Sequence, residues 1–208
     1  MEVHPLRGYR HLFFDLDHTL WDFETNSRAV LLELHGEFGL AERGVAAPEF
    51  IAVYEAVNAG LWARYDSGTL PKEALRALRF RKTLEHFGSR DARSADLLEG
   101  AYMTRCPARA ALNPGVMELL HDLRPKYRMH IINNGFIEAQ ARKLKASGIR
   151  HFFDVVLTSE QAGAGKPSKR IFRHALRSAN AKAAESLMIG DNAIADIRGA
   201  RGAGIDQA

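Results

Sequence analysis

The strongest constraint on the fold is an alternation of strand-like and helix-like segments from residue 113 to the end of the 208-residue chain. Three short apolar runs, "RMHIIN", "FDVVLT" and "ESLMIGD", have the composition of buried strands, and the residues between them have helical patterns. Strands that alternate with helices form a parallel sheet covered by helices on both faces. We therefore expect an α/β fold with three layers.

The expected helices of this part cover residues 113–123, 137–146, 168–178 and 193–202. The first of them has Asn113 as an N-cap and Pro114 at its first position, both typical of a helix start. The last residues, "GIDQA", resemble the beginning of a further strand. We expect this strand to leave one edge of the sheet poorly covered.

The residues between 26 and 105 follow a different pattern. Four helix-like stretches lie there, separated by Gly, Pro and Ser, and no segment has a strand pattern. They cover residues 26–38, 48–65, 72–87 and 91–105. A short strand at residues 11–14 precedes them. We therefore expect a core of residues 1–22 and 110–208, split by an inserted four-helix domain of residues 23–109.

Composition narrows the class of protein. No apolar run approaches the roughly 18 residues of a membrane span, and the N-terminal residues lack the apolar region of a secretory signal. Cys106 is the only cysteine, so no internal disulfide can form and a cytoplasmic location is expected. The net charge of +4 suits small anions, whereas the scattered basic residues predict no nucleic-acid partner.

Two carboxylates follow the first strand, in the stretch "FFDLDHTLWD". Because side chains alternate between the faces of a strand, Asp15 and Asp17 should point the same way. Two carboxylates this close repel each other, which makes a poor core and a plausible metal or proton-transfer site.

Other polar residues also follow predicted strands, where ligands bind in open α/β sheets. "NNG" places Asn133 after the second strand, "GKP" places Lys166 in a loop, and "GDNAIAD" supplies Asp191 and Asp196. Several carboxylates with one amide and one ammonium suit a cation with oxygen ligands, Mg2+, facing a phosphoryl group.

The order of "DLDHTL", "NNG", "GKP" and "GDNAIAD" resembles that of the haloacid dehalogenase superfamily, across the whole core. The resemblance implies a Rossmann-like catalytic core. It also implies that the insertion between Asp17 and Asn133 is a helical cap of the C1 type, with hinges near residues 23–26 and 105–113. Enzymes of this kind hydrolyse small soluble phosphates through an aspartyl-phosphate intermediate.

The resemblance also implies roles for single residues. Asp15 would be the nucleophile, and Asp17 the general acid and base whose backbone carbonyl also binds the metal. Lys166 would neutralise the nucleophile and the phosphate. Asp191 would bind Mg2+ directly, and Asp196 would act on it through water. Asp17 also favours a phosphatase over a dehalogenase, because a halide leaving group needs no proton.

The phosphate would be bound by Lys166 and by the "NNG" residues Asn133, Asn134 and Gly135, with Asp17 and His18 beside it. Asn133 departs from the family, which normally has Thr or Ser there. An amide NH2 can also donate a hydrogen bond to phosphate.

The substrate is less constrained. "TLWDFE" and "IINNGF" resemble the bacterial pyrimidine 5'-nucleotidase branch, which implies a nucleoside 5'-monophosphate. Candidates for contact with the base or sugar are Trp21, Phe23, Tyr54, Trp62, Tyr65 and Arg64. The alternatives are another small-metabolite phosphatase, such as one for phosphoglycolate, a sugar phosphomutase, and a non-catalytic binding protein. The sequence leaves open whether the chain is a monomer or a weak dimer.

Overall fold

The structure is a computed structural model that describes residues 8–208. The first seven residues, which contributed to the expected absence of a secretory signal, lie outside the described residues. The chain divides into two compact units, Met1–Phe23 with Arg109–Ala208, and Glu24–Ala108. Each unit is described by itself.

The first unit contains a five-stranded parallel sheet in the order β3-β2-β1-β4-β5. Its strands are β1 (His11–Phe14), β2 (Arg128–Asn133), β3 (Phe153–Thr158), β4 (Ser186–Ile189) and β5 (Asp206–Gln207). The four strands expected upstream are present, and "GIDQA" forms the expected edge strand β5. The sheet order places β1, which carries the paired aspartates at its end, in the centre.

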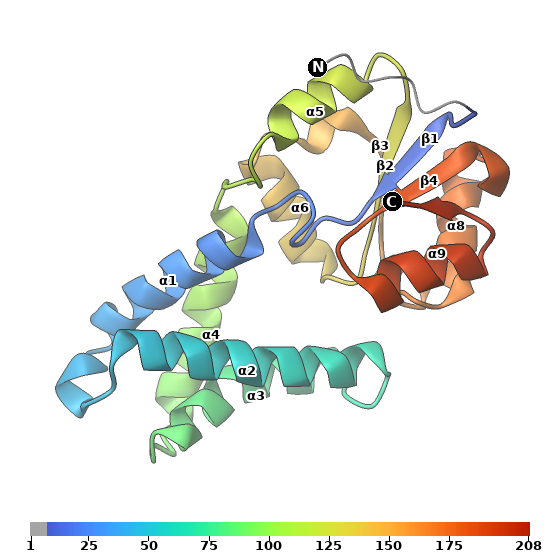
Figure 1. Cartoon of the computed structure of the whole chain (residues 1–208). Helices are drawn as coiled ribbons and strands as arrows, with labels where there is room; N and C mark the ends of the chain where they lie inside the picture. Colours follow the sequence, from blue (N-terminus) through green and yellow to red (C-terminus); the bar gives the residue numbers. More distant parts are fainter. Residues whose placement is uncertain (1–7) are drawn as a thin grey trace. The chain divides into compact units, whose positions relative to one another are not determined.

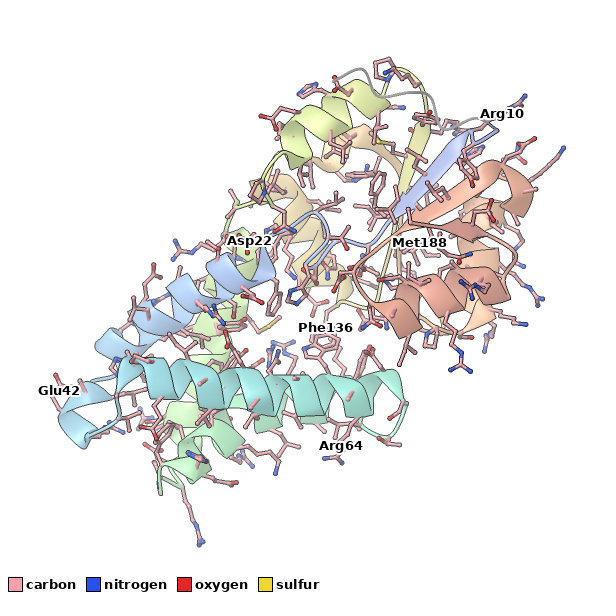
Figure 2. All side chains as sticks on the ribbon, viewed as in Figure 1. Arg10, Asp22, Glu42, Arg64, Phe136 and Met188 are labelled. Atoms are coloured by element: carbon pink, nitrogen blue, oxygen red, sulfur yellow. The ribbon has the colours of Figure 1, made fainter. Side chains whose placement is uncertain are left out.

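Helices cover both faces of this sheet (Figure 1). The helices α5 (Val116–Leu123) and α6 (Ile137–Ala146) lie on one face, and α8 (Lys169–Ala179) and α9 (Gly199–Gly202) lie on the other. Phe13, Ile132 and Met188 pack with Ile171 and Phe172 of α8 in a buried cluster, and Figure 2 labels Met188 on β4. The three-layer α/β, Rossmann-like architecture is confirmed.

Most helix boundaries differ from the sequence prediction by one to three residues, and two helices of the first unit differ in kind. The prediction that Asn113 caps a helix is wrong, because α5 begins at Val116 after Gly115, which has a left-handed φ of 80°. The Asn113 amide donates instead to the carbonyls of His18 and Thr19, at 2.7 and 3.0 Å. The small-residue helix near the C-terminus is divided into a π-helical segment, η5 (Ala193–Arg198), and α9.

The second unit is formed by helices, as expected for the insertion. They are α1 (Phe23–Glu37), α2 (Ala47–Asp66), α3 (Lys72–His86) and α4 (Ala92–Arg105). Its core contains the rings of Tyr54, Phe80 and Tyr102, with centroids 4.8–5.6 Å apart. Arg79 and Glu99 form a buried ion pair beside them. Within residues 8–208, no helix is both long and apolar enough to cross a membrane.

Shorter helical segments complete the chain. One α-helical turn, α7 (Ser159–Ala162), follows β3. The 3-10 turns are η1 (Ala41–Arg43), η2 (Cys106–Ala108), η3 (Arg150–Phe152) and η4 (Ala183–Glu185). The α7 turn begins with a capping box between Thr158 and Gln161, which fixes where the chain leaves β3. The loop after α7 carries Lys166.

Candidate active site

The residues predicted from the four motifs lie at the carboxyl ends of β1, β2 and β4 and in the loop after β3. Asp15 directly follows β1, and its backbone N–H donates to the Ile189 carbonyl of β4 at 2.9 Å. Asn133 is the last residue of β2, and Asp191 follows β4. Parallel strands in neighbouring positions bring these ends together at one edge.

Lys166 joins two of the predicted carboxylates. Its side chain is 3% exposed, and its ammonium donates to Asp15 Oδ1 and, at 2.6 Å, to Asp196 Oδ1. Burial lowers the pKa of Lys166, but the charges of Asp15 and Asp196 outweigh burial and raise it above its usual value. Lys166 is therefore a charged residue inside the site and is not a solvated loop lysine.

The Asp15 carboxyl is buried beside two other carboxylates, Asp17 and Asp196. Burial raises the pKa of Asp15 to about 7, the Lys166 charge opposes this, and the charges of Asp196 and Asp17 add to it. Burial and the neighbouring carboxylates therefore outweigh the single positive charge of Lys166 at Asp15. A bound cation would lower this pKa and keep the carboxylate ionised.

The residues fit a divalent cation. Oxygen atoms of Asp15, Asp191 and Asp196 all lie within 4.8 Å of one another. With Lys166, these three carboxylates leave a formal charge of −2, which a divalent cation would balance. All available ligand atoms are oxygens, as Mg2+ prefers. Asp196 is 1% exposed, and its oxygen lies within this distance of the oxygens of Asp15 and Asp191. The family resemblance had implied only a contact with the metal through water.

Small residues hold these carboxylates in place. Thr19 Oγ1 donates to Asp191 Oδ1 at 3.2 Å and accepts from the Asp191 backbone N–H at 3.1 Å. A Cβ at Gly190 would lie 2.4 Å from Asp196 Oδ2, so only glycine leaves room for that side chain. Thr19 lies in the "DLDHTL" motif, but sequence reasoning assigned it no role.

The Asn133 amide has a defined orientation. Its Oδ1 accepts the Gly135 N–H at 2.9 Å, and its Nδ2 is buried without a partner among the described residues. Asn133 is 1% exposed, and an unpaired buried NH2 is costly. The group left free is the donor, as the sequence analysis required for contact with a phosphoryl oxygen.

The Asn134 side chain forms two hydrogen bonds with the backbone of Lys166. Its Nδ2 donates to the Lys166 carbonyl at 3.0 Å, and its Oδ1 accepts the Lys166 N–H at 2.7 Å. A Cβ at Gly165 would lie 3.0 Å from this Oδ1. The Asn134 side chain thus holds the Lys166 loop in place. A contact between Asn134 and the phosphate stays a prediction.

Asp17 lies in a different environment from Asp15. β1 ends at Phe14, so strand alternation does not place Asp17, which forms a β-bridge with Trp21 instead. Gln140 and Lys143 of α6 donate to its two carboxylate oxygens at 2.8 and 2.5 Å. Burial alone would raise the pKa of Asp17, but Lys143 and the two hydrogen bonds lower it below its usual value.

Sequence reasoning missed Gln140 and Lys143. The signal available was their spacing of three in a predicted helix directly after "NNG", which places both on one helix face. Such spacing is common in helices and has no link to Asp17 in the sequence. Their role follows from the packing of α6 beside the loop after β1.

The candidate substrate contacts lie in unlike environments. His18 is exposed, has a left-handed φ of 66°, and its ring centroid lies 4.8 Å from that of Phe23, which is half-buried. Trp21 and Tyr54 are buried in the cores of their units, so they offer no free face to a base. Further candidates are half-buried or exposed side chains of α2, namely Trp62, Tyr65 and Arg64, the last labelled in Figure 2.

Comparisons with known proteins show which family this chain resembles. A model of the haloacid dehalogenase-like hydrolase family matches residues 9–204. The chain is 32% identical over 197 residues to the pyrimidine 5'-nucleotidase YjjG of Escherichia coli (strain K12), covering 93% of the chain and 82% of that protein. It is 34% identical over 216 residues to a phosphoserine phosphatase of Thermus thermophilus, covering 93% and 85%.

A solved structure is also similar over almost the whole chain. The crystal structure of the HAD-hydrolase YfnB from Bacillus subtilis bound to magnesium superimposes with a TM-score of 0.87 at 29% identity. The match covers 96% of this chain and 87% of that one. All four matches therefore include both units of the chain.

Proposed function

The chain belongs to the haloacid dehalogenase-like hydrolase family, and from this premise we propose that it is a Mg2+-dependent phosphatase that acts through an aspartyl-phosphate on Asp15. Its phosphatase relatives support hydrolysis of a phosphate ester as the reaction. The observation that carries the proposal is the buried ammonium of Lys166 between Asp15 and Asp196, with Asp191 beside them.

The proposed reaction has two half-reactions. In the first, an Asp15 carboxylate oxygen bonds to phosphorus while the bond to the ester oxygen breaks, and Asp17 gives that oxygen a proton. In the second, water bonds to phosphorus, Asp17 takes a proton from the water, and the bond between phosphorus and Asp15 breaks. The products are an alcohol and inorganic phosphate. Charge on the phosphoryl oxygens is stabilised by Lys166 and by the free NH2 of Asn133.

The metal ligands in this proposal are Asp15, the Asp17 carbonyl and Asp191, with Asp196 acting through water. The ion supplies positive charge that offsets repulsion between the carboxylates and the phosphate. The oxygen atoms of Asp15, Asp191 and Asp196 within 4.8 Å of one another support a cation beside these carboxylates, and the related YfnB structure contains magnesium.

The proposed substrate is a nucleoside 5'-monophosphate. Identity of 32% to YjjG, named a pyrimidine 5'-nucleotidase, supports this choice. The 34% identity to a phosphoserine phosphatase keeps another small phosphate as the second candidate. We assign the helical unit, Glu24–Ala108, as the cap that reads the leaving group, and a single cysteine in the sequence agrees with a cytoplasmic enzyme.

The test is a panel of phosphate esters assayed with Mg2+ and with EDTA. Phosphate release is expected for small esters, fastest for UMP, CMP and TMP, compared with phosphoserine, phosphoglycolate and hexose phosphates. Phosphate release should depend on Mg2+ and disappear in Asp15→Asn. Isomerised sugar phosphate without free phosphate would indicate a mutase. No turnover of any ester would indicate a binding protein, and either result would contradict the proposal.

A further inference from the structure

The Asp17 carboxylate is held by two side chains of one helix. Gln140 Nε2 donates to Asp17 Oδ2 at 2.8 Å, and Lys143 Nζ donates to Asp17 Oδ1 at 2.5 Å. Each carboxylate oxygen therefore has its own donor on α6. None of the four motifs that indicated the family includes either donor.

Packing fixes the position of the Lys143 ammonium. The side chain is 7% exposed, and Nζ lies 4.3 Å from the Trp21 ring centroid and 5.4 Å from that of Phe23. A cation over two aromatic faces is stabilised by the rings and keeps little rotamer freedom. Lys143 is therefore placed by its surroundings and in turn restrains Asp17.

The absence of a side chain at Gly135 leaves room for the Gln140 amide. A Cβ at Gly135 would lie 1.8 Å from Gln140 Nε2 and 2.6 Å from Cδ, which is a severe clash. The backbone of Gly135 is outside the left-handed region, so conformational freedom does not explain the glycine. The glycine of "NNG" thus has a steric role linked to Asp17.

We propose that Gln140 and Lys143 are positioning residues for Asp17 in the hydrolysis of the aspartyl-phosphate, and that Gly135 is required to admit Gln140. This inference rests on the proposed function. In that step the water oxygen bonds to phosphorus, Asp17 takes one water proton, and the bond from phosphorus to Asp15 breaks. Two donors hold the carboxylate in a single orientation, so a remaining lone pair can be directed at the water.

The two half-reactions should respond differently when the donors are removed. With p-nitrophenyl phosphate the leaving group is acidic and needs little help from a general acid, so formation of the aspartyl-phosphate should change little. Its hydrolysis still needs an oriented base. Loss of a donor should therefore slow the second half-reaction specifically.

The experiment measures the burst of p-nitrophenol and the steady-state turnover in Gln140→Met and Lys143→Met, which keep side-chain length but lose the donor. We expect turnover to fall about 100-fold, with the burst rate within about threefold of wild type and no rise in KM. Lys143→Arg should recover most of the turnover. The control is Lys145→Met, an exposed position on α6, which should behave as wild type.

A second arm tests the glycine. Gly135→Ala should slow turnover about as much as Gln140→Met, because the methyl group displaces the amide. In a Gln140→Ala background the methyl group has room, so adding Gly135→Ala should cost little further. Such non-additivity is the mark of two residues acting through one contact.

Three results would overturn the inference: wild-type turnover in both methionine variants, equal slowing of burst and turnover, or additive effects of the Gly135 and Gln140 changes. If Lys143→Met fails to fold, Gln140→Met and the glycine arm decide. A wild-type enzyme that releases no phosphate from any ester would contradict the proposed function itself and is distinguishable from these results.

Discussion

Two buried lysines give the paired aspartates their different properties. Lys166 shares its charge between Asp15 and Asp196, so burial still raises the pKa of Asp15 to about 7. Lys143 contacts Asp17 and, with Gln140, lowers the pKa of that carboxyl despite its burial. Two carboxyls two residues apart therefore differ in the direction of their pKa shift, because their neighbours differ.

The proposed role of Asp15 as nucleophile can be tested by one amide substitution. Asp15→Asn should lower turnover by about 10³-fold or more, because a nucleophile is removed. The fold should remain, since the amide keeps the shape and removes a buried charge. Phosphate release and a thermal melt on the same sample provide the measurement. Activity within tenfold of wild type, with a normal melt, would contradict the assignment of Asp15.

Asn133 is the position at which the family resemblance implied Thr or Ser. Asn133→Ala should lower kcat/KM about 10–150-fold, because a charge-assisted hydrogen bond contributes roughly 1.5–3 kcal/mol. Asn133→Thr should keep or raise activity, since a hydroxyl both accepts from Gly135 and donates. Asn133→Asp keeps the shape, loses the donor and adds a negative charge that repels phosphate, so it should cost at least as much as Asn133→Ala. An alanine variant as active as wild type would exclude Asn133 from phosphate binding.

The strand β2 ends at the candidate site residue Asn133 and contains a buried histidine, His130. His130 is fully buried, its ring lies 5.3 Å from that of His11 and 4.7 Å from that of Phe13, and its Nδ1 has no partner among the described residues. Burial first, and the charge of His11 next, lower the pKa of His130 to about 4. The strand therefore folds with this imidazole neutral.

This histidine should make stability depend on pH. The unfolded pKa is about 6.5, so the contribution of His130 is complete above that pH and is lost as the pH falls toward 4. In that window the unfolded chain binds a proton that the folded chain excludes. The free energy of unfolding should fall by up to about 1.4 kcal/mol per pH unit from this residue. Arg124, Arg128 and Asp154 also act on the ring.

The measurement compares urea unfolding of wild type and His130→Phe from pH 4.5 to 7.5. The contribution of Asp15 to the free energy of unfolding changes with pH in the opposite direction. Its pKa is raised to about 7 in the folded state, so its contribution is lost as the pH rises. Taking the difference between the two proteins removes the contribution of Asp15. The wild type should gain stability relative to the variant as the pH rises to 6.5. A difference independent of pH would contradict the prediction.

At the scale of the whole molecule, the metal site should couple binding to folding. The oxygens of Asp15, Asp191 and Asp196 converge only when β1, β4 and η5 are folded, so Mg2+ should bind the folded state alone. At 100 times Kd, such binding adds about 2.7 kcal/mol and raises Tm by about 5–10 °C. Asp191 is exposed, and its substitution should leave the apo fold intact.

The test is a thermal melt with and without Mg2+, in wild type and Asp191→Asn. The wild-type Tm should rise with Mg2+ and return with EDTA, whereas the variant should show little rise. An equal rise in both proteins would mean that Mg2+ binds elsewhere. Activity is not needed for this measurement, so it is independent of the substrate.

Local sequence patterns were sufficient for the architecture and for the expectation that most of the candidate residues lie together at one edge of the sheet. Strand composition and helical periodicity are local properties, and the four strands before "GIDQA" were predicted from them. Parallel strands bring their carboxyl ends to one edge, so the ends of β1, β2 and β4 indicated Asp15, Asn133 and Asp191 without any knowledge of contacts. Lys166 came from a motif in the loop after β3.

The side chains that contact those residues could be identified only from the folded structure. Gln140 and Lys143 lie 123 and 126 residues from Asp17 in sequence, and Thr19 lies 172 residues from Asp191. The same reason explains the wrong N-cap, because Asn113 bonds to the distant His18 carbonyl in place of its own helix. A side chain's partner depends on how elements pack, and packing is a property of the folded chain, which local sequence patterns do not contain.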